Sequence, residues 1–590
     1  MISRRPTRTV RGSPRSGMAP GLLVAMVLLA ACAPKASVVQ SSGSSPTQAA
    51  ATIVPKTLTI VTQAEPKGLN PYLSPGLTAG GDAQAHLIAH NYLVVSTDQG
   101  TPRPQLAERV ISTDDGSWRL NSDGTMDTTW TLRPNEKWQD GAPFTAEDLV
   151  FTFAVYKDPA IPGNPGSVLG SSAAVLKAME SAEALDPRTL VIHWSTVNAD
   201  ADLAPNLVPL PQHLVADTYQ TDKANLVNSP LFGPQFIGLG PYRLIRWEPG
   251  VQMEFARFDD YFLGRPPLDG VVLKFIGDPN AMVASILSGN SDVVLPHGVD
   301  IQLAQDVKQL WEGTGNQVVT SFAGSMNYLE IEHRPEYARP VNGLTNTLVR
   351  QALYNAIDRQ PVADIATAGA SPVADNWFPP TDALYPQVQS AIPQYPYDLS
   401  LAQQRLAQAG WLRNADGDLV SQTTGERFDV ELWGAPNNFS DRLLPAIASG
   451  WQSLGAQVGI VLIPAARSSD AEYRNTFPGA QITGSLTNQF YTSVLDSRQP
   501  AGPDNRWTGA NRSGYVNPAL DALYDRLALT IDPAARIALH RSIIQTTLGD
   551  VALMPLYWTY VPILSLKGVH GVGGMVGNTN TWNIFEWTKD

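Results

Sequence analysis

The sequence predicts a protein of several α/β lobes, in which strands and helices interleave without a strict repeat. The chain has 590 residues, whereas a single hydrophobic core stops growing at roughly 250–300 residues, so two or three lobes are expected. Hydrophobic residues make up 43% of the chain and charged residues 16%, which is the balance of a globular protein. The elements lack the regular βαβ cadence that a single doubly wound sheet requires.

The N-terminal segment 1–31 has the pattern of a secretory signal peptide. A basic stretch comes first, and the short apolar run 21–31 follows it. This run is shorter than the roughly 20 apolar residues that span a bilayer, so we do not expect a stable membrane helix. The sequence Leu29-Ala-Ala-Cys32 resembles the lipobox of bacterial lipoproteins, in which the cysteine is acylated and becomes the first residue. Twin-arginine export is an alternative route, because Arg4 and Arg5 are adjacent.

Cys32 is the only cysteine of the chain, so no disulfide can form within it. If Cys32 is acylated, no thiol remains for catalysis or for binding a metal. Residues 32–55 are rich in Ser, Ala and Pro and are predicted to be a flexible lipoprotein tether, because they cannot bury enough apolar surface to fold.

The folded body after residue 55 mixes both kinds of element. Strands are predicted at 58–62, 128–133 and 271–276, from β-branched runs and alternating patterns. Helices are predicted at 149–156, 281–287, 347–359, 401–409, 517–530 and 533–548. The first of these helices follows Thr145-Ala-Glu-Asp148, a capping box with Asp in place of the usual Glu.

The formal net charge of −13 argues against binding nucleic acid or anionic lipid by charge attraction. The usual sequence signatures of enzymes are also missing: we find no Gly-x-Ser-x-Gly elbow and no Walker phosphate loop. His86 and His90 are four residues apart in a predicted helix, but Leu87 stands where a metalloprotease needs a glutamate. We therefore predict no metal, no cofactor and no catalytic residue.

A series of landmarks runs through the chain in a fixed order. It consists of Glu65-Pro66 with Leu69-Asn-Pro-Tyr72, Trp130-Thr-Leu-Arg133 with Trp138-Gln-Asp-Gly-Ala-Pro-Phe-Thr-Ala-Glu-Asp-Leu-Val150, Gly238-Leu-Gly-Pro-Tyr242 with Arg257-Phe-Asp-Asp-Tyr-Phe-Leu-Gly264, Ser288–Val293, Val349–Arg359, Ala409-Gly-Trp411, Gly514-Tyr-Val-Asn-Pro518 and Leu553-Met-Pro-Leu-Tyr557. The series resembles the bacterial extracellular solute-binding proteins of family 5, the dipeptide, oligopeptide and nickel class of ABC transporter substrate-binding lipoproteins. Each landmark alone is weak, and their order is what carries the resemblance.

The resemblance implies a periplasmic-binding-protein-like fold of type II, with two α/β lobes, a hinge and an extra domain inserted in the first lobe. Lobe I would comprise 56–95, 205–325 and 556–590. The inserted domain would comprise 96–204, and lobe II would comprise 326–555. Such a protein closes on a solute that binds between its lobes.

The resemblance also directs attention to 479–491, where peptide-binding members carry an aspartate that pairs with the amino group of a peptide. This chain has no aspartate in that stretch, and we take Asn488 and Tyr491 as candidate ligand-binding residues. Trp377 and Trp433 are two further candidates, because indole faces are platforms for sugar rings or peptide planes. The missing carboxylate favours a solute without a free ammonium group, such as an oligosaccharide or a blocked peptide.

We therefore expect a substrate-binding lipoprotein of an ABC importer, which captures a peptide-like or oligosaccharide-like solute and delivers it to permease subunits in the membrane. The protein would be an extracytoplasmic monomer, anchored to the cell membrane by lipid at Cys32, at the cell surface or in the periplasm. A smaller solute such as a metal chelate stays open. The alternatives are a sensor-type binding protein and a secreted hydrolase.

Overall fold

The computed structural model describes residues 56–73, 82–162, 175–203, 207–437, 439–574 and 580–590. The predicted signal peptide (1–31), the tether (32–55) and Cys32 lie outside the described residues. All described residues belong to one unit, Pro55–Asp590. Within these ranges we find no helix that combines the length and the apolar character needed to cross a bilayer.

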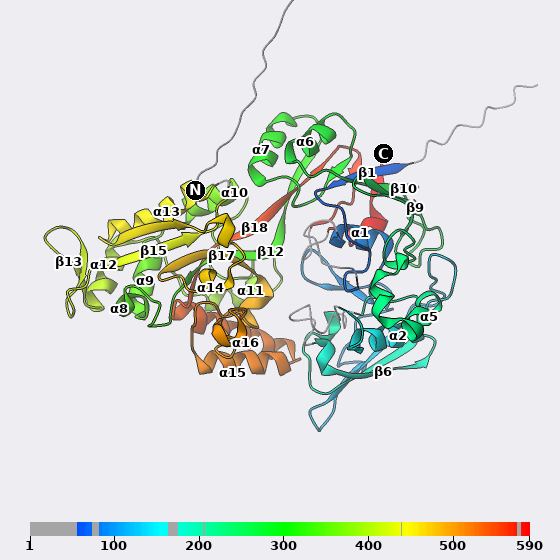
Figure 1. Cartoon of the computed structure of the whole chain (residues 1–590), viewed down its shortest axis with the longest axis horizontal. Coiled ribbons are helices and arrows are strands. Elements are labelled where there is room, and N and C mark those ends of the chain that lie inside the picture. Colours follow the sequence, from blue (N-terminus) through cyan, green and yellow to red (C-terminus); the bar gives the residue numbers. More distant parts are fainter. Residues whose placement is uncertain (1–55, 74–81, 163–174, 204–206, 438, 575–579) are drawn as a thin grey trace, which may run out of the picture. The chain divides into compact units, whose positions relative to one another are not determined.

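A ten-stranded mixed sheet is the largest element of the structure (Figure 1). In spatial order its strands are β16 (Gln457–Leu462), β15 (Asp429–Gly434), β17 (Ala480–Leu486), β12 (Gln317–Ile331), β18 (Leu553–Ser565), β11 (Val293–Val294), β1 (Thr57–Thr62), β10 (Gly270–Phe275), β9 (Gln252–Arg257) and β8 (Tyr242–Glu248). We call β16, β15, β17 and β12 the β15 half of the sheet. We call β11, β1, β10, β9 and β8 the β1 half. Strand β18 lies between the two halves.

The two halves are joined through the long antiparallel pair of β12 and β18. β18 also pairs with β11, which in turn runs parallel to β1. The register of β12 against β18 shifts between Phe322 and Met326, so three residues of β12 stand opposite one residue of β18. Gly324 lies in this irregular segment with φ 73°, a conformation that costs glycine little and other residues more.

Helices and short elements pack around the β15 half. They are α8 (Val341–Leu344), α9 (Thr347–Asn355), α10 (Arg359–Thr367), α11 (Tyr385–Val388), η4 (Gln389–Ala391), α12 (Leu399–Gln408), the hairpin β13 (Trp411–Arg413) and β14 (Leu419–Ser421), α13 (Ser440–Ser453), η5 (Ala465–Arg467), α14 (Ala471–Arg474), η6 (Thr487–Tyr491), η7 (Pro503–Asn505), α15 (Pro518–Leu529) and α16 (Pro533–Gly549). Two apolar clusters form the core here. One contains Leu353, Leu432 and Trp451, and the other contains Trp377, Phe490 and Ile543.

The β1 half carries a separate four-stranded antiparallel sheet in the order β4 (Trp118–Leu120), β5 (Met126–Thr131), β7 (Thr189–Trp194) and β6 (Met179–Asp186). The other elements are α1 (Asp82–Ala89), β2 (Val94–Ser96), β3 (Pro102–Pro104), α2 (Ala146–Lys157), η1 (Ala201–Leu203), α5 (Gln212–Thr221), η2 (Lys223–Asn228), η3 (Pro230–Phe232), α6 (Pro279–Leu287), α7 (Ile301–Leu310), β19 (Val569–His570), η8 (Ile584–Glu586) and β20 (Thr588–Lys589). The four-stranded sheet shares one apolar core with α2 and α5.

Most predicted elements are confirmed, and one is wrong in extent. The strand predicted at 58–62 is β1, the strand at 271–276 is β10, and the helix at 281–287 is α6. The helix predicted at 347–359 ends at Asn355, and a new helix, α10, starts at Arg359. The reason is the extended backbone of Asp358 and the proline at position 361, which fits the first turn of a new helix but not the interior of a continuing one.

Candidate functional site

A pocket of about 200 Å³ opens beside the carboxyl ends of β15 and β16. Ala435 and Asn437 follow β15 directly, and Ile463 follows β16. In open α/β sheets, ligands bind in the crevice outside the carboxyl ends of parallel strands, and β15 runs parallel to β16 and β17. We therefore treat this pocket, which we call the strand-end pocket, as the candidate solute site.

The polar lining of the strand-end pocket comes from three strands, one loop and one helix. Its polar side chains are Asn327 of β12, Asn437, Arg474 of α14, Gln481 and Thr483 of β17, and Tyr557 of β18. None of the described residues that line it is an aspartate or a glutamate. The pocket therefore offers amide, hydroxyl and guanidinium groups, which suit neutral or anionic chemical groups of a solute.

Two of these side chains form hydrogen bonds to neighbouring residues, and a third has a buried acceptor without a donor. Asn327 Nδ2 donates to Thr559 Oγ1 at 2.8 Å, and Thr483 Oγ1 accepts from Arg512 Nη2 at 2.9 Å. Gln481 is only 1% exposed, yet its Oε1 has no hydrogen-bond donor among the described residues. A buried acceptor without a donor costs free energy, which a solute with an N–H or O–H group would recover.

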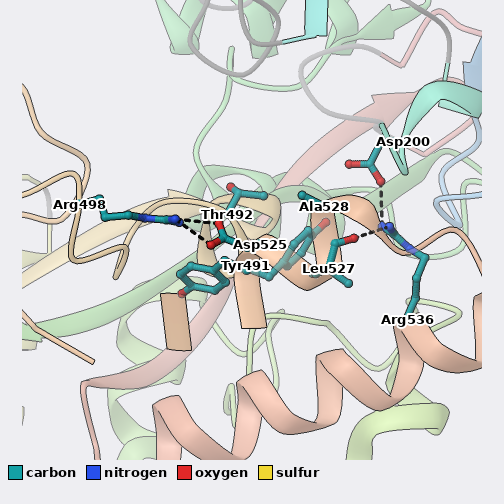
Figure 2. Close-up of a pocket in the computed structure, with 9 residues that line it drawn as sticks. Asp200, Tyr491, Thr492, Arg498, Asp525, Leu527, Ala528 and Arg536 are labelled. Carbon is teal, nitrogen blue, oxygen red and sulfur yellow. Dashed lines mark hydrogen bonds and ion pairs between the residues drawn. The ribbon is translucent and has the colours of Figure 1, made fainter. Parts of the chain in front are cut away.

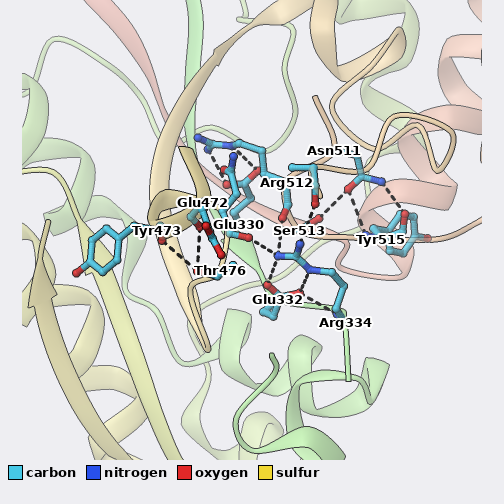
Figure 3. A network of polar contacts seen from close by, with 12 residues as sticks. Glu330, Glu332, Arg334, Glu472, Tyr473, Thr476, Asn511, Arg512, Ser513 and Tyr515 are labelled. Atoms are coloured by element: carbon cyan, nitrogen blue, oxygen red, sulfur yellow. Dashed lines mark hydrogen bonds and ion pairs between the residues drawn. The ribbon is translucent and has the colours of Figure 1, made fainter. Parts of the chain in front are cut away.

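Two ion pairs (Figure 3) lie next to the pocket, where Arg512 contacts the lining residue Thr483. Arg512 Nη2 lies 2.6 Å from Glu330 Oε2, and Arg334 Nη2 lies 2.6 Å from Glu332 Oε2. Burial lowers the pKa of the Arg512 guanidinium, but the adjacent Glu330 carboxylate outweighs this and raises the pKa overall. Burial also raises the pKa of Glu332, against the opposing effect of Arg334. These four charges are satisfied within the protein and fix β12 against the segment around Ser513.

Arg474 is a different case, because it lines the pocket and has no carboxylate partner among the described residues. Its Nη1 donates to the carbonyl oxygen of Ser468 at 3.3 Å. Burial lowers the pKa of Arg474, the positive charge of Arg512 lowers it further, and Glu330 acts in the opposite direction. The wall of the pocket therefore carries one positive charge that no described side chain balances.

A second pocket, of about 160 Å³, lies between η1 and the helices α15 and α16 (Figure 2). Arg536 Nη2 lies 2.8 Å from Asp200 Oδ1 across it, and Arg498 Nη1 lies 2.7 Å from Asp525 Oδ1 on its rim. Tyr491 is half-buried at its wall, and burial raises the pKa of its hydroxyl. Because charged pairs of the protein already occupy this pocket, it suits a contact between elements better than a solute.

The structure places the four candidate residues as follows. Trp377 is fully buried, and its ring stacks on Phe490 with the centroids 5.8 Å apart. Trp433 is the penultimate residue of β15, donates from Nε1 to Glu431 Oε2 at 2.7 Å and is 7% exposed. Asn488 is exposed on η6, and Tyr491 lines the second pocket. None of the four lines the strand-end pocket, and their part in binding stays a prediction.

Sequence reasoning missed the residues that do line the strand-end pocket. Asn327, Asn437, Arg474 and Tyr557 come from distant parts of the chain, and strand pairing brings them together. Gln481, Ile482, Thr483 and Gly484 fall in the stretch 479–491 to which the sequence directed attention. The signal that could have found Asn437 is its place just after the short run Asp429–Gly434, which forms β15.

His86 and His90 are buried structural groups. His86 Nδ1 lies 2.7 Å from the carbonyl oxygen of Leu69, and His90 Nε2 lies 2.9 Å from that of Pro209. Burial lowers the pKa of His86 to about 4. Among the described residues, we find no group of three or more His, Cys, Asp or Glu side chains placed to hold a metal ion.

Relatives of this chain are binding proteins for different solutes. The oligopeptide-binding protein AppA of Bacillus subtilis is 28% identical over 52% of this chain, and the match spans 53% of that protein, about half its length. The dipeptide-binding protein of Escherichia coli is 24% identical over 83% of this chain and 87% of that protein. The heme-binding protein A of Haemophilus influenzae is 26% identical over 79% of each chain.

Solved structures show the same fold. HbpA2 from Haemophilus parasuis superposes with a TM-score of 0.72 at 20% identity, covering 90% of this chain and 100% of that one. AppA from Bacillus subtilis, solved with a nonapeptide, gives a TM-score of 0.62 at 22% identity, covering 91% of this chain and 100% of that one. The α/β fold of two lobes expected from the sequence is thereby confirmed.

The family model described as "Bacterial extracellular solute-binding proteins, family 5 Middle" matches residues 101–497. That range takes in most of the landmarks in the sequence, the four-stranded sheet and most of the β15 half. The chain therefore belongs to the family 5 bacterial extracellular solute-binding proteins, which are binding proteins of ABC transporters and not enzymes.

Proposed function

We propose that this protein captures a peptide-like or oligosaccharide-like solute without a free ammonium group and delivers it to an ABC permease. The observation that carries the proposal is the strand-end pocket, whose polar lining is built from amide, hydroxyl and guanidinium groups and contains no described carboxylate. The peptide-binding names of several relatives support a peptide-like solute. The absent carboxylate favours a blocked peptide or a sugar over a peptide with a free amino terminus.

The proposed mechanism is closure of two lobes on the solute. We propose lobe I as 56–95, 205–325 and 556–590, with 96–204 inserted in it, and lobe II as 326–555. The paired strands β12 and β18 connect the two halves of the sheet, and their irregular segment at Gly324 is a place where they could bend. Solute that contacts both lobes favours the closed form by its differential contacts. The permease would then recognise that form.

A binding experiment tests the solute class. Native mass spectrometry of the purified protein should show a retained solute, and thermal shift should detect further ones, because a solute at 100 times its Kd stabilises by about 2.7 kcal/mol. Acetylated tetrapeptides and neutral tetrasaccharides should raise the melting temperature more than tetrapeptides with a free amino terminus. A larger shift with the unblocked peptides would contradict the proposal.

We also propose that the mature protein is a monomer anchored outside the cytoplasmic membrane by lipid at Cys32. The support is the signal-peptide pattern and Leu29-Ala-Ala-Cys32. Changing Cys32 to Ser should abolish incorporation of labelled palmitate and release the protein from the membrane fraction, with solute binding unchanged. Labelled Cys32→Ser protein that stays on the membrane would overturn the anchor.

A further inference from the structure

Arg474 is the unbalanced charge of the strand-end pocket. Three other arginines of this region have a carboxylate partner: Arg467 pairs with Asp470 at 2.9 Å, Arg334 with Glu332 and Arg512 with Glu330. The side chain of Arg474 is half-buried, and its hydrogen bond to the carbonyl oxygen of Ser468 is long, at 3.3 Å. A guanidinium has five N–H donors, so most of its donor capacity faces the pocket or water.

The surroundings of Arg474 favour an anion from outside the protein. Glu330 balances the charge of Arg512, so the pair contributes little net charge to the pocket. The chain as a whole has a formal net charge of −13, so the positive charge of this pocket is opposite in sign to that of the protein. Part of the desolvation cost at Arg474 would be recovered if a carboxylate bound there, because guanidinium and carboxylate form paired, charge-assisted hydrogen bonds.

A second, independent feature of the same pocket points to a ligand. The buried Gln481 lines the pocket, and its Oε1 has no donor among the described residues. Asn327 and Asn437 add further amide groups to the lining. A solute that satisfies both kinds of group must carry an acidic group together with neutral N–H or O–H donors.

We propose that Arg474 binds a carboxylate of the solute, so that the strand-end pocket is a subsite for an acidic group. This inference rests on the proposed function and narrows it. Two kinds of solute share the required chemistry: a peptide with a blocked amino terminus and a free carboxyl terminus, and an acidic oligosaccharide. Arg474 is then the group that separates these solutes from their neutral analogues.

Two matched pairs of probes test the subsite by isothermal titration calorimetry. One pair is N-acetyl-tetra-alanine as the free acid and as the C-terminal amide. The other is trigalacturonic acid and its methyl ester. In at least one pair the acid should bind about 10- to 100-fold more tightly than the neutral form, as expected for hydrogen bonds to a charged group. The pair that shows the preference identifies the source of the carboxylate.

Variants then assign the preference to Arg474. Arg474→Gln should remove it, so that the acid binds no more tightly than the neutral form. Arg474→Lys should keep part of it, because the charge remains and the paired geometry is lost. Arg467→Gln is the matched control: Arg467 lies in the same segment and pairs with Asp470, so its loss should leave the preference in place.

The results separate the subsite from the proposed function. Equal binding of acid and neutral forms, or a preference that survives Arg474→Gln, would reject the subsite and leave the proposed function standing. A solute retained through purification must likewise carry an acidic group and be lost from Arg474→Gln. If no probe binds and no solute is retained, the proposed function fails, and the subsite fails with it.

Discussion

Glu136 is a buried carboxyl group that the fold tolerates by keeping it protonated. Neither oxygen has a hydrogen-bond partner among the described residues, and the side chain is almost wholly inaccessible. Burial raises its pKa to about 9, against the opposing charges of Arg133 and Arg188. The folded state therefore keeps a proton that the unfolded chain loses near pH 4.5, and stability from this group is lost as the pH rises between these two values.

Changing Glu136 to Gln should remove this loss, because the amide cannot ionise. Relative to the wild type, the variant should gain on the order of 2–4 kcal/mol in free energy of unfolding at pH 8, and little at pH 5. Urea denaturation at the two pH values measures the difference. The exposed Glu312→Gln serves as the control and should show no such gain. A Glu136→Gln variant with the same offset at both pH values would contradict the prediction.

The individual residues of the strand-end pocket could be predicted from the sequence only in part. The resemblance selected the stretch 479–491, and within it the structure puts Gln481 and Thr483 in the strand-end pocket and Asn488 outside it. Side chains alternate along a strand, so a stretch can be placed without knowing which of its residues face a pocket. Arg474 could not be found because its role depends on which arginines have partners, and the partners of Arg334 and Arg512 are known only from the fold.

At the level of elements, sequence patterns predicted position well and boundaries less well. The apolar and β-branched run at 58–62 and the helix at 533–548 recur as β1 and α16, because each has a clear pattern and a defined start. The break between α9 and α10 escaped detection because apolar periodicity continues across it. The pairing of β12 with β18, more than 200 residues apart, follows from no local pattern.

The irregular segment of β12 gives a prediction at this scale. Gly324 has φ 73°, where a side chain is strained by about 1–2 kcal/mol. Gly324→Ala should lower the free energy of unfolding by about that amount, and it should change the rate of solute binding if the strands bend there. Urea denaturation and stopped-flow fluorescence measure the two effects. The neighbouring Ser325→Ala is the control, and equal effects at both positions would count against a special role for Gly324.

At the scale of the molecule, buried histidines make the fold sensitive to acid. Burial is the largest cause that lowers the pKa of His86 and His540 to about 4 and that of His333 to about 3. Because these values lie below the unfolded value near 6.5, the unfolded chain takes up protons first. The stabilising contribution is complete above pH 6.5 and is lost as the pH falls toward 4.

The histidine effect is best measured in the Glu136→Gln variant, because the Glu136 carboxyl group changes the stability with pH in the opposite direction. In this variant the free energy of unfolding should fall on the order of 2–5 kcal/mol between pH 7 and pH 4.5. Thermal and urea denaturation across this range provide the measurement. The ion-paired Asp158, whose pKa is lowered to about 2 mainly by its hydrogen bond from Lys223, should not titrate in this window. Stability that stays constant from pH 7 to 4.5 would show that the buried histidines do not control the acid response.

The second pocket contains direct contacts between η1 and the helix pair α15 and α16. Besides the ion pair of Asp200 with Arg536 (Figure 2), the backbone N–H of Ala199 donates to the carbonyl oxygen of Ala528 at 3.2 Å. Ile531, between these helices, packs against the core of the four-stranded sheet. These contacts join the parts that we propose as the inserted domain and lobe II.

If these contacts hold the closed form, Asp200→Asn should speed solute release by up to about fivefold, in line with the small value of a partly exposed ion pair. The association rate should change less. Asp525→Asn is the matched control, because Asp525 pairs with Arg498 within the β15 side of the same pocket. Stopped-flow displacement of a bound solute gives both rates, and an equal acceleration in the two variants would argue against the contact between the parts.

The position of β18 has a consequence for synthesis and quality control. This strand comes late in the chain, at Leu553–Ser565, yet it lies in the interior of the ten-stranded sheet between β12 and β11. A polypeptide that terminates before Leu553 would leave the long edge of β12 and the short strand β11 without their partner in the middle of the sheet, and unpaired edges favour aggregation. A nonsense or frameshift mutation upstream of Leu553 should therefore give no partly active product, and selection should act on the full-length reading frame.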